Sequence, residues 1–170
     1  RHQRDQFLDR GLGLVEQDAQ SGRYGLGPLA MQLGLISLQQ YDPVRLATPL
    51  IGELARTLGH TVGVAVWGNR GPTMVRIEEA PSAVHVNMRH GTVMSLRNTA
   101  SGRLFAAYLA EDTVLTALEE ERAYDLRHAS ISPAVPPRLD ADFSKILKKV
   151  RQNGISDAVN LSVPGVSALA

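Results

Sequence analysis

The sequence predicts an α+β protein in which one antiparallel sheet is covered mainly on one face by helices. Three successive β-type segments are joined by turns too short for a crossover helix, which favours antiparallel neighbours. Strand segments and helix segments are also grouped along the chain. The 170 residues, 44% hydrophobic and 21% charged, suit one good-sized soluble domain, or one domain with a fragment.

The N-terminal part predicts the end of a helix followed by a β-hairpin. Residues 1–10 hold Phe7 and Leu8 among polar residues, a pattern that suits the end of an amphipathic helix. Residues 14–26 predict a hairpin that turns at residues 20–22 and returns along Arg23–Leu26. Because a hairpin this small is not stable alone in water, it must be the edge of a larger unit. One common setting is the wing of a winged helix-turn-helix DNA-binding domain.

Two helices are predicted after the hairpin. The first covers residues 28–40, with an apolar face made of Leu29, Leu33 and either Leu35 or Ile36. The second starts at Asp42-Pro43, an N-cap followed by proline in the first turn, and ends at Gly59. Because Pro49 lies inside this helix, we expect either a kink or a restart capped by Thr48. Its leucines recur every four residues, at Leu46, Leu50, Leu54 and Leu58.

Three strands are predicted next, over residues 61–67, 73–78 and 83–89. The turn at Gly68–Pro72 separates the first two. Each strand alternates apolar residues with other residues, as expected when one face is buried. Met94–Leu96 is predicted to form a further brief strand.

Helices and two short strands are predicted in the rest of the chain. Asn98 or Thr99 caps a helix that runs to about Leu109, and Asp112 caps another short helix. Residues 130–137 are a proline-rich loop. Strands are expected near residues 155–159 and 166–170. The last helix, which Asn153-Gly154 ends, has an apolar face made of Leu139, Phe143, Ile146, Leu147 and Val150.

The composition excludes several classes of protein. A net charge of +1 is too small to indicate nucleic-acid binding by itself, and without cysteine there is no disulfide and no thiolate metal site. The five histidines lack metal-ligand spacing, so no metal or cofactor is expected. No catalytic triad, phosphate loop or dinucleotide motif is present, so we expect a protein that is not an enzyme. No membrane-spanning segment or secretion signal is seen, and a cytoplasmic protein is the default.

The segment Asn98–Gly102 is the best candidate for a binding site. Small residues at a helix start, here Ala100, Ser101 and Gly102, leave backbone N–H groups open, and the helix dipole favours an anion there. Ser101 can add a hydroxyl hydrogen bond. The alternative is that Ala100 and Gly102 only permit close helix–sheet packing.

Three further residues are weaker candidates for this pocket. Met88 and Leu96, with Val86, can form an apolar wall, although any sheet core needs the same residues. Asp157 follows a predicted helix and lies near the start of a predicted strand, where it can meet a polar ligand atom, although a solvated turn carboxylate is the commoner case.

Motifs from Gly11 to Ala170 resemble one known family. The segments are ATPLIGELA at 47–55, LGHTVGVAV at 58–66, VRIE at 75–78, VNMRHG at 86–91, SLRNTASGRL at 95–104 and GVSALA at 165–170. Together with the hairpin they resemble, in order and spacing, bacterial regulators of the isocitrate lyase regulator (IclR) family. The stretch 95–104, in which small residues, glycine and a basic residue open a helix, is the most distinctive.

The resemblance implies a transcription regulator that forms a homodimer or homotetramer. Residues 1–27 would then be the remnant of the winged helix-turn-helix domain, 28–42 a linker helix and 43–170 a truncated GAF-like domain, an antiparallel sheet flanked by helices. That domain is expected to bind a small organic acid and change the affinity for operator DNA, with Asn98–Gly102 lining its pocket. We expect the chain to be cut at both ends, without the helices that read DNA bases.

Two questions stay open at this point. Arg23 and Tyr24 on the wing can contact a DNA phosphate, although residues 1–30 balance arginine against acidic residues, so this piece alone should bind DNA poorly. The rival interpretation is a GAF-like dimerisation module whose pocket is closed by its own side chains and takes no ligand.

Overall fold

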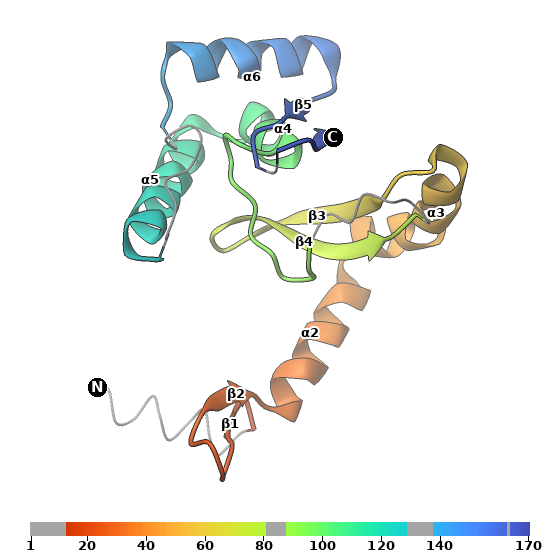
Figure 1. Cartoon of the computed structure of the whole chain (residues 1–170), viewed down its shortest axis with the longest axis vertical. Helices are drawn as coiled ribbons and strands as arrows, with labels where there is room; N and C mark the ends of the chain where they lie inside the picture. Colours follow the sequence, from red (N-terminus) through yellow and green to blue (C-terminus); the bar gives the residue numbers. More distant parts are fainter. Residues whose placement is uncertain (1–12, 81–87, 129–137, 163) are drawn as a thin grey trace. The chain divides into compact units, whose positions relative to one another are not determined.

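The computed structural model describes residues 13–80, 88–128, 138–162 and 164–170. The chain divides into two compact units, Arg1–Leu50 and Ile51–Ala170. Both contain helices and antiparallel strands, as predicted (Figure 1). The strands of the described residues pair as three separate two-stranded sheets, where the sequence analysis expected one sheet.

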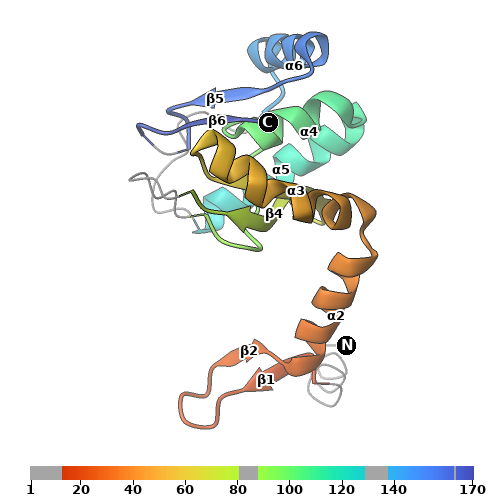
Figure 2. The ribbon, with the colours of Figure 1, turned by 90° about the vertical axis from the view of Figure 1, so that its right-hand side faces the viewer.

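The first unit contains the predicted hairpin. β1 (Val15–Gln17) pairs antiparallel with β2 (Tyr24–Leu26), and Val15 lies opposite Leu26 (Figure 2). In the turn, Asp18 Oδ1 accepts the N–H of Ser21 at 2.6 Å and that of Gln20 at 3.1 Å. These bonds to a carboxylate stabilise the turn. The hairpin predicted from the sequence is therefore confirmed.

α2 covers Pro28–Gln40, the range that the sequence predicts. Proline stands in the first turn, where the missing N–H costs nothing. None of the residues of α2 is buried; Leu33, Leu35 and Ile36 of its predicted apolar face are exposed, and Leu29 is half-buried. The described residues therefore leave most of this face uncovered.

α3 (Asp42–Leu58) begins in the first unit and continues into the second. It passes through Pro49 without the restart considered above, and the Thr48 hydroxyl donates to the Val44 carbonyl oxygen at 2.7 Å instead of capping a new helix. The buried residues of α3 are Val44, Ile51 and Ala55, whereas the leucines at positions 46, 50, 54 and 58 are exposed.

The second unit begins with a β-hairpin. β3 (Val62–Gly68) pairs antiparallel with β4 (Gly71–Glu78), with an irregularity in the register between Val64 and Ala65. The tight turn needs Gly71, whose φ of +125° is unfavourable for other residues. The predicted strand at 83–89 lies largely outside the described residues.

The brief strand predicted at Met94–Leu96 is wrong. Here the chain makes only an isolated bridge between Val93 and Thr73. Met94 N–H donates to the Pro72 carbonyl oxygen at 2.7 Å, but proline has no N–H with which to return the second bond of the pair. The ladder therefore stops after one bridge.

Three helices follow. α4 covers Ala100–Tyr108 with Thr99 as N-cap, and α6 covers Ala141–Asn153 and ends at Gly154 in the left-handed conformation, both close to the prediction. α5 (Glu111–His128) begins one residue before its predicted cap Asp112 and, at 18 residues, is not short. Its second half contains strong helix formers such as Glu and Arg, and these extend it. The predicted loop 130–137 lies outside the described residues.

The core of the second unit lies where these helices meet. Phe143 and Leu147 of α6 pack with Ala106 of α4, Val114 of α5 and the loop residue Leu96. β5 (Asp157–Val159) pairs antiparallel with β6 (Ser167–Leu169), and α4 contacts α6, β4 and both of these strands (Figure 1). α4 is therefore the central helix of the unit. Within the described residues, no helix has both the length and the apolar character needed to cross a membrane.

Candidate functional site

The first turn of α4 is closely packed against the loop before it. The Thr99 hydroxyl accepts the Gly102 N–H at 2.9 Å and donates to the Ser95 carbonyl oxygen at 2.7 Å. A Cβ at Gly102 would lie 2.1 Å from that same carbonyl oxygen. Ala100 is also buried, at 2% exposure. Close packing, the alternative to a pocket role, therefore accounts for Gly102 and Ala100.

Two other backbone N–H groups of this turn have no hydrogen-bond acceptor among the described residues. The N–H groups of Ala100 and Ser101 make no hydrogen bond to any described residue. Ser101 is half-buried, and the first turn of α4 contains no acidic residue. Adjacent amides at a helix N-terminus, without a competing carboxylate, favour an anion.

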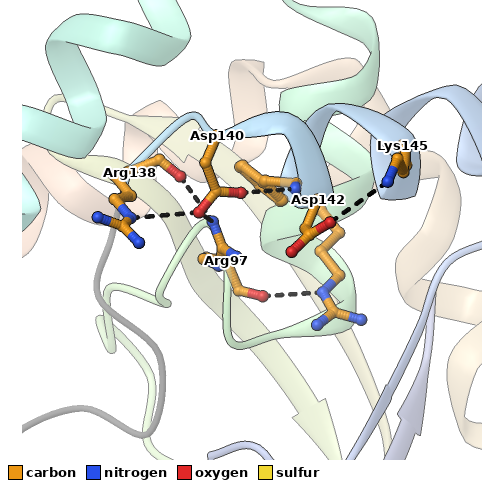
Figure 3. Close-up of polar contacts among 7 residues, drawn as sticks. Arg97, Arg138, Asp140, Asp142 and Lys145 are labelled. Atoms are coloured by element: carbon orange, nitrogen blue, oxygen red, sulfur yellow. Dashed lines mark hydrogen bonds and ion pairs between the residues drawn. The ribbon is translucent and has the colours of Figure 1, made fainter.

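Arg97 ties the loop to the start of α6 (Figure 3). Its side chain is buried, with Nη1 2.9 Å from Asp140 Oδ2 and 2.8 Å from the Arg138 carbonyl oxygen, to which it donates. Its guanidinium lies 5.3 Å from the centre of the Phe143 ring, a cation–π contact. This loop position is therefore fixed by charge, hydrogen bonding and packing together.

Asp140 is the N-cap of α6. Its Oδ1 accepts the Phe143 N–H at 2.9 Å, and its Oδ2 is paired with Arg97 and with Arg138. The Phe143 N–H, followed by the Arg97 guanidinium, lowers the pKa of Asp140 to about 2. The carboxylate is therefore ionised wherever the protein is folded near neutral pH.

Arg103 of α4 joins the loop to β5. Its Nε donates to the Arg97 carbonyl oxygen at 2.8 Å, and its Nη1 donates to the Asp157 carbonyl oxygen at 2.7 Å. Burial lowers the pKa of Arg103, and the Asp157 carboxylate opposes that shift. The chain between β5 and β6 also reaches the loop, since the Ser162 hydroxyl donates to the Asn98 carbonyl oxygen at 2.7 Å.

The structure thus brings some of the predicted site residues together. One segment of five residues contains Asn98, Ala100, Ser101 and Gly102. Arg103 links this turn to Asp157, which is itself exposed. Leu96, at 1% exposure, belongs to the hydrophobic core, so its packing role is clear and its role as a pocket wall stays a prediction.

The remaining predicted residues are placed as follows. Met88 is half-buried, next to residues outside the described part of the chain, and its role also stays a prediction. Arg23 and Tyr24 lie exposed on the hairpin of the first unit. In the described ranges no group of three or more His, Asp or Glu side chains can hold a metal ion.

The sequence analysis missed Arg97, Arg103, Asp140 and Glu121, whose carboxylate accepts the Leu96 N–H at 3.0 Å. Only Asp140 had a local signal, because an aspartate just before an apolar helix is a typical N-cap. The others contact partners far along the chain, which no local pattern encodes.

Comparison with known proteins defines the class of the chain. Residues 36–170 match the family model for the C-terminal region of bacterial transcriptional regulator IclR. The chain is 28% identical over 160 residues to the glycerol operon regulatory protein of Streptomyces coelicolor, covering 93% of this chain and 59% of that protein. It is 23% identical over 139 residues to the transcriptional repressor IclR of Escherichia coli, covering 81% of this chain and 50% of that protein.

Solved structures agree with this result. HmgR of Pseudomonas aeruginosa is 34% identical with a TM-score of 0.63, covering 98% of this chain and 63% of that one. A putative IclR-type regulator from a Silicibacter species is 20% identical and shares the fold with a TM-score of 0.81, covering 99% of this chain and 64% of that one. The chain spans about half to two thirds of the length of these relatives. It belongs to the IclR family.

Proposed function

We propose that residues 43–170 are the effector domain of a DNA-binding regulator, and that a small organic acid bound at the start of α4 changes its affinity for operator DNA. The observation that carries this proposal is the pair of unused amides of Ala100 and Ser101 within the described residues. They lie in a turn that the side chains of Arg97 and Arg103 hold in place. Hydrogen bonds with Glu121 of α5 and with Ser162, between β5 and β6, hold the loop before it. A preorganised pair of N–H donors binds a carboxylate without the cost of ordering them first.

The proposal gives each residue of the site a role. The carboxylate of the acid accepts hydrogen bonds from the amides of Ala100 and Ser101, and the Ser101 hydroxyl adds a third donor. Asn98 and Asp157 lie beside the turn and can contact polar groups of the ligand. Leu96 and Met88 supply apolar contacts. No cofactor takes part.

The first unit contributes the contact with DNA. Residues 1–27 are the remnant of the winged domain, and Arg23 and Tyr24, both exposed on the hairpin, contact phosphates. α2, within the linker 28–42, has no buried residue, which fits a contact between copies in a homodimer or homotetramer. Such a regulator works in the cytoplasm, where its operator is.

A thermal shift experiment tests the ligand site. Benzoate and propionate serve as probes of aromatic and short-chain acids. A bound acid stabilises the folded protein by mass action, by about 2.7 kcal/mol at 100 times Kd, and so raises the melting temperature of the intact protein. Ser101→Trp should abolish the shift. Ser144→Trp, at an exposed position of α6, should leave it unchanged. A full shift in the Ser101→Trp protein would remove this turn from the proposal.

The rival function is a dimerisation module without a ligand. The close packing of Gly102 and the burial of Ala100 favour it, because both are explained without a bound molecule. The same titration separates the two functions. If a wider panel of carboxylic acids leaves the melting temperature of the wild-type protein unchanged, the module without a ligand is the better account.

A further inference from the structure

Glu121 is the inward-facing member of an acidic run on α5. Glu119 and Glu120 are exposed, whereas Glu121 is half-buried against the loop that leads into α4. Its Oε2 accepts the Leu96 N–H at 3.0 Å, and the Ser95 side chain lies near enough to favour the ionised carboxylate. One carboxylate thus interacts with two neighbouring residues of the loop.

A chain of hydrogen bonds runs from this carboxylate to the first turn of α4. The hydroxyl of Ser95, the neighbour of Leu96 in the loop, accepts the Asn98 N–H at 3.1 Å. The Ser95 carbonyl oxygen accepts the Thr99 hydroxyl at 2.7 Å, and Thr99 in turn accepts the Gly102 N–H at 2.9 Å. Each link fixes the next, so the position of the helix start depends on the anchor at Glu121.

We propose that Glu121 is a latch, a side chain of α5 whose hydrogen bond with the Leu96 N–H positions the Ser95–Thr99 loop, and with it the donors at the start of α4. Its role as a positioning residue for an effector rests on the function proposed above. Its role as a latch on the loop is independent of that function, because the hydrogen bonds form without a ligand.

The charges around Glu121 set the direction of the pH response. Burial raises the pKa of Glu121 above its ordinary value of 4.5, the Ser95 side chain and the Leu96 N–H lower it, and the Asp125 carboxylate one turn further along α5 raises it. The groups that face Glu121 from the loop are a hydroxyl and an amide, without charge. From the β3–β4 turn, the Arg70 guanidinium lies over Tyr124 of α5, 4.9 Å from the ring centre.

The linkage between protonation of Glu121 and opening of the latch sets the direction of the pH dependence. When the latch opens, Glu121 becomes solvated and its pKa returns toward the ordinary value, so the closed latch binds the proton more tightly than the open one. Low pH therefore favours the closed latch. As pH rises through the raised pKa, the buried carboxylate ionises and opening becomes easier.

Amide hydrogen exchange of the intact protein tests the latch. Protection factors of Leu96 and Asn98, corrected for the intrinsic rate at each pH, are measured in the wild type and in variants from pH 4, below the ordinary pKa of the Glu121 side chain, to pH 8. The wild type should lose protection as pH rises. Glu121→Gln, neutral at every pH and still an acceptor, should keep its protection across the range. Glu121→Ala should exchange about tenfold faster or more at Leu96 even at low pH, because it lacks the acceptor.

Two further variants serve as controls. Glu120→Ala, next in sequence but exposed, should behave as the wild type. Ser95→Ala should raise exchange at Asn98 while leaving Leu96 protected, since it removes only the second link. If Glu121→Ala does not fold, the contrast between the wild type and Glu121→Gln decides the question. Equal pH profiles in those two proteins would overturn the latch.

A benzoate titration separates the latch from the ligand site. If the wild type binds benzoate, Glu121→Ala should weaken binding several-fold and Glu120→Ala should not. Binding that is unchanged in Glu121→Ala would contradict the positioning role. If a panel of carboxylic acids shows no binding to the wild type, the proposed function and the positioning role fail together, and the exchange data alone then uphold or overturn the latch on the loop.

Discussion

At the scale of single residues, Gly102 shows how little space the start of α4 leaves. A Cβ at this position would meet the Ser95 carbonyl oxygen at 2.1 Å and the Leu96 Cα at 2.6 Å, both of them backbone atoms that cannot rotate away. We expect Gly102→Ala to lower the free energy of unfolding by about 1–3 kcal/mol, the usual range for overpacking. Chemical denaturation measures the change.

Gly52→Ala is the matched control. Gly52 lies inside α3, and no atom stands within 4 Å of a Cβ built there. Alanine should therefore be neutral or stabilise by about 0.5–1 kcal/mol, as expected for a helix interior. If Gly102→Ala were as stable as Gly52→Ala, the close packing described for the first turn of α4 would be wrong.

At the scale of elements, the start of α6 depends on the ionised side chain of Asp140. Because the folded protein holds the pKa of Asp140 at about 2, below its ordinary 3.8, the carboxylate stabilises the folded state above about pH 4. This contribution is lost as pH falls toward 2. We expect Asp140→Asn to be less stable than the wild type at pH 7, with a difference that shrinks below pH 4 and vanishes near pH 2.

Denaturation curves at several pH values check this expectation. Asp142→Asn is the control, because Asp142 is exposed and its ion pair, with the equally exposed Lys145 at 3.5 Å, is a weak surface pair. It should change stability little at any pH. A constant difference between Asp140→Asn and the wild type from pH 2 to 7 would show that the Arg97–Asp140 pair does not stabilise the ionised form.

Several element boundaries were predictable from the sequence because their signals are local. Pro28 in a first turn, Thr99 as a cap and Gly154 in the left-handed conformation mark helix ends through groups within a few residues. Local signals do not show which side of a helix is buried. α3 buries Val44 and Ile51 and leaves exposed the leucines that recur every four residues, because burial depends on the neighbours that the fold supplies.

At the scale of the whole molecule, the sequence indicated where the candidate site lies but not what holds it. The small residues from Ala100 to Gly102 identified the turn. The anchors are Arg97 of the loop, which pairs with the α6 N-cap Asp140, and Glu121 of α5, which accepts the Leu96 N–H of the loop. Charged residues on a helix are usually solvated, so only the fold distinguishes Glu121 from its exposed neighbours on α5.

The proposed contact of the hairpin with DNA predicts a salt dependence that can be measured with the intact protein. If Arg23 neutralises one phosphate, Arg23→Ala should weaken DNA binding similarly for all sequences and reduce the slope of log K against log salt by about 1. Arg122→Ala, at an exposed position of α5 in the second unit, should leave the slope unchanged.

Titration of operator and unrelated DNA at several salt concentrations gives both quantities. A loss confined to the operator would instead indicate that Arg23 reads a base, because a phosphate contact carries no sequence information. An unchanged slope would mean that the hairpin does not reach the DNA backbone. In that case the first unit would meet DNA, if at all, through residues other than the exposed Arg23 of the β1–β2 hairpin.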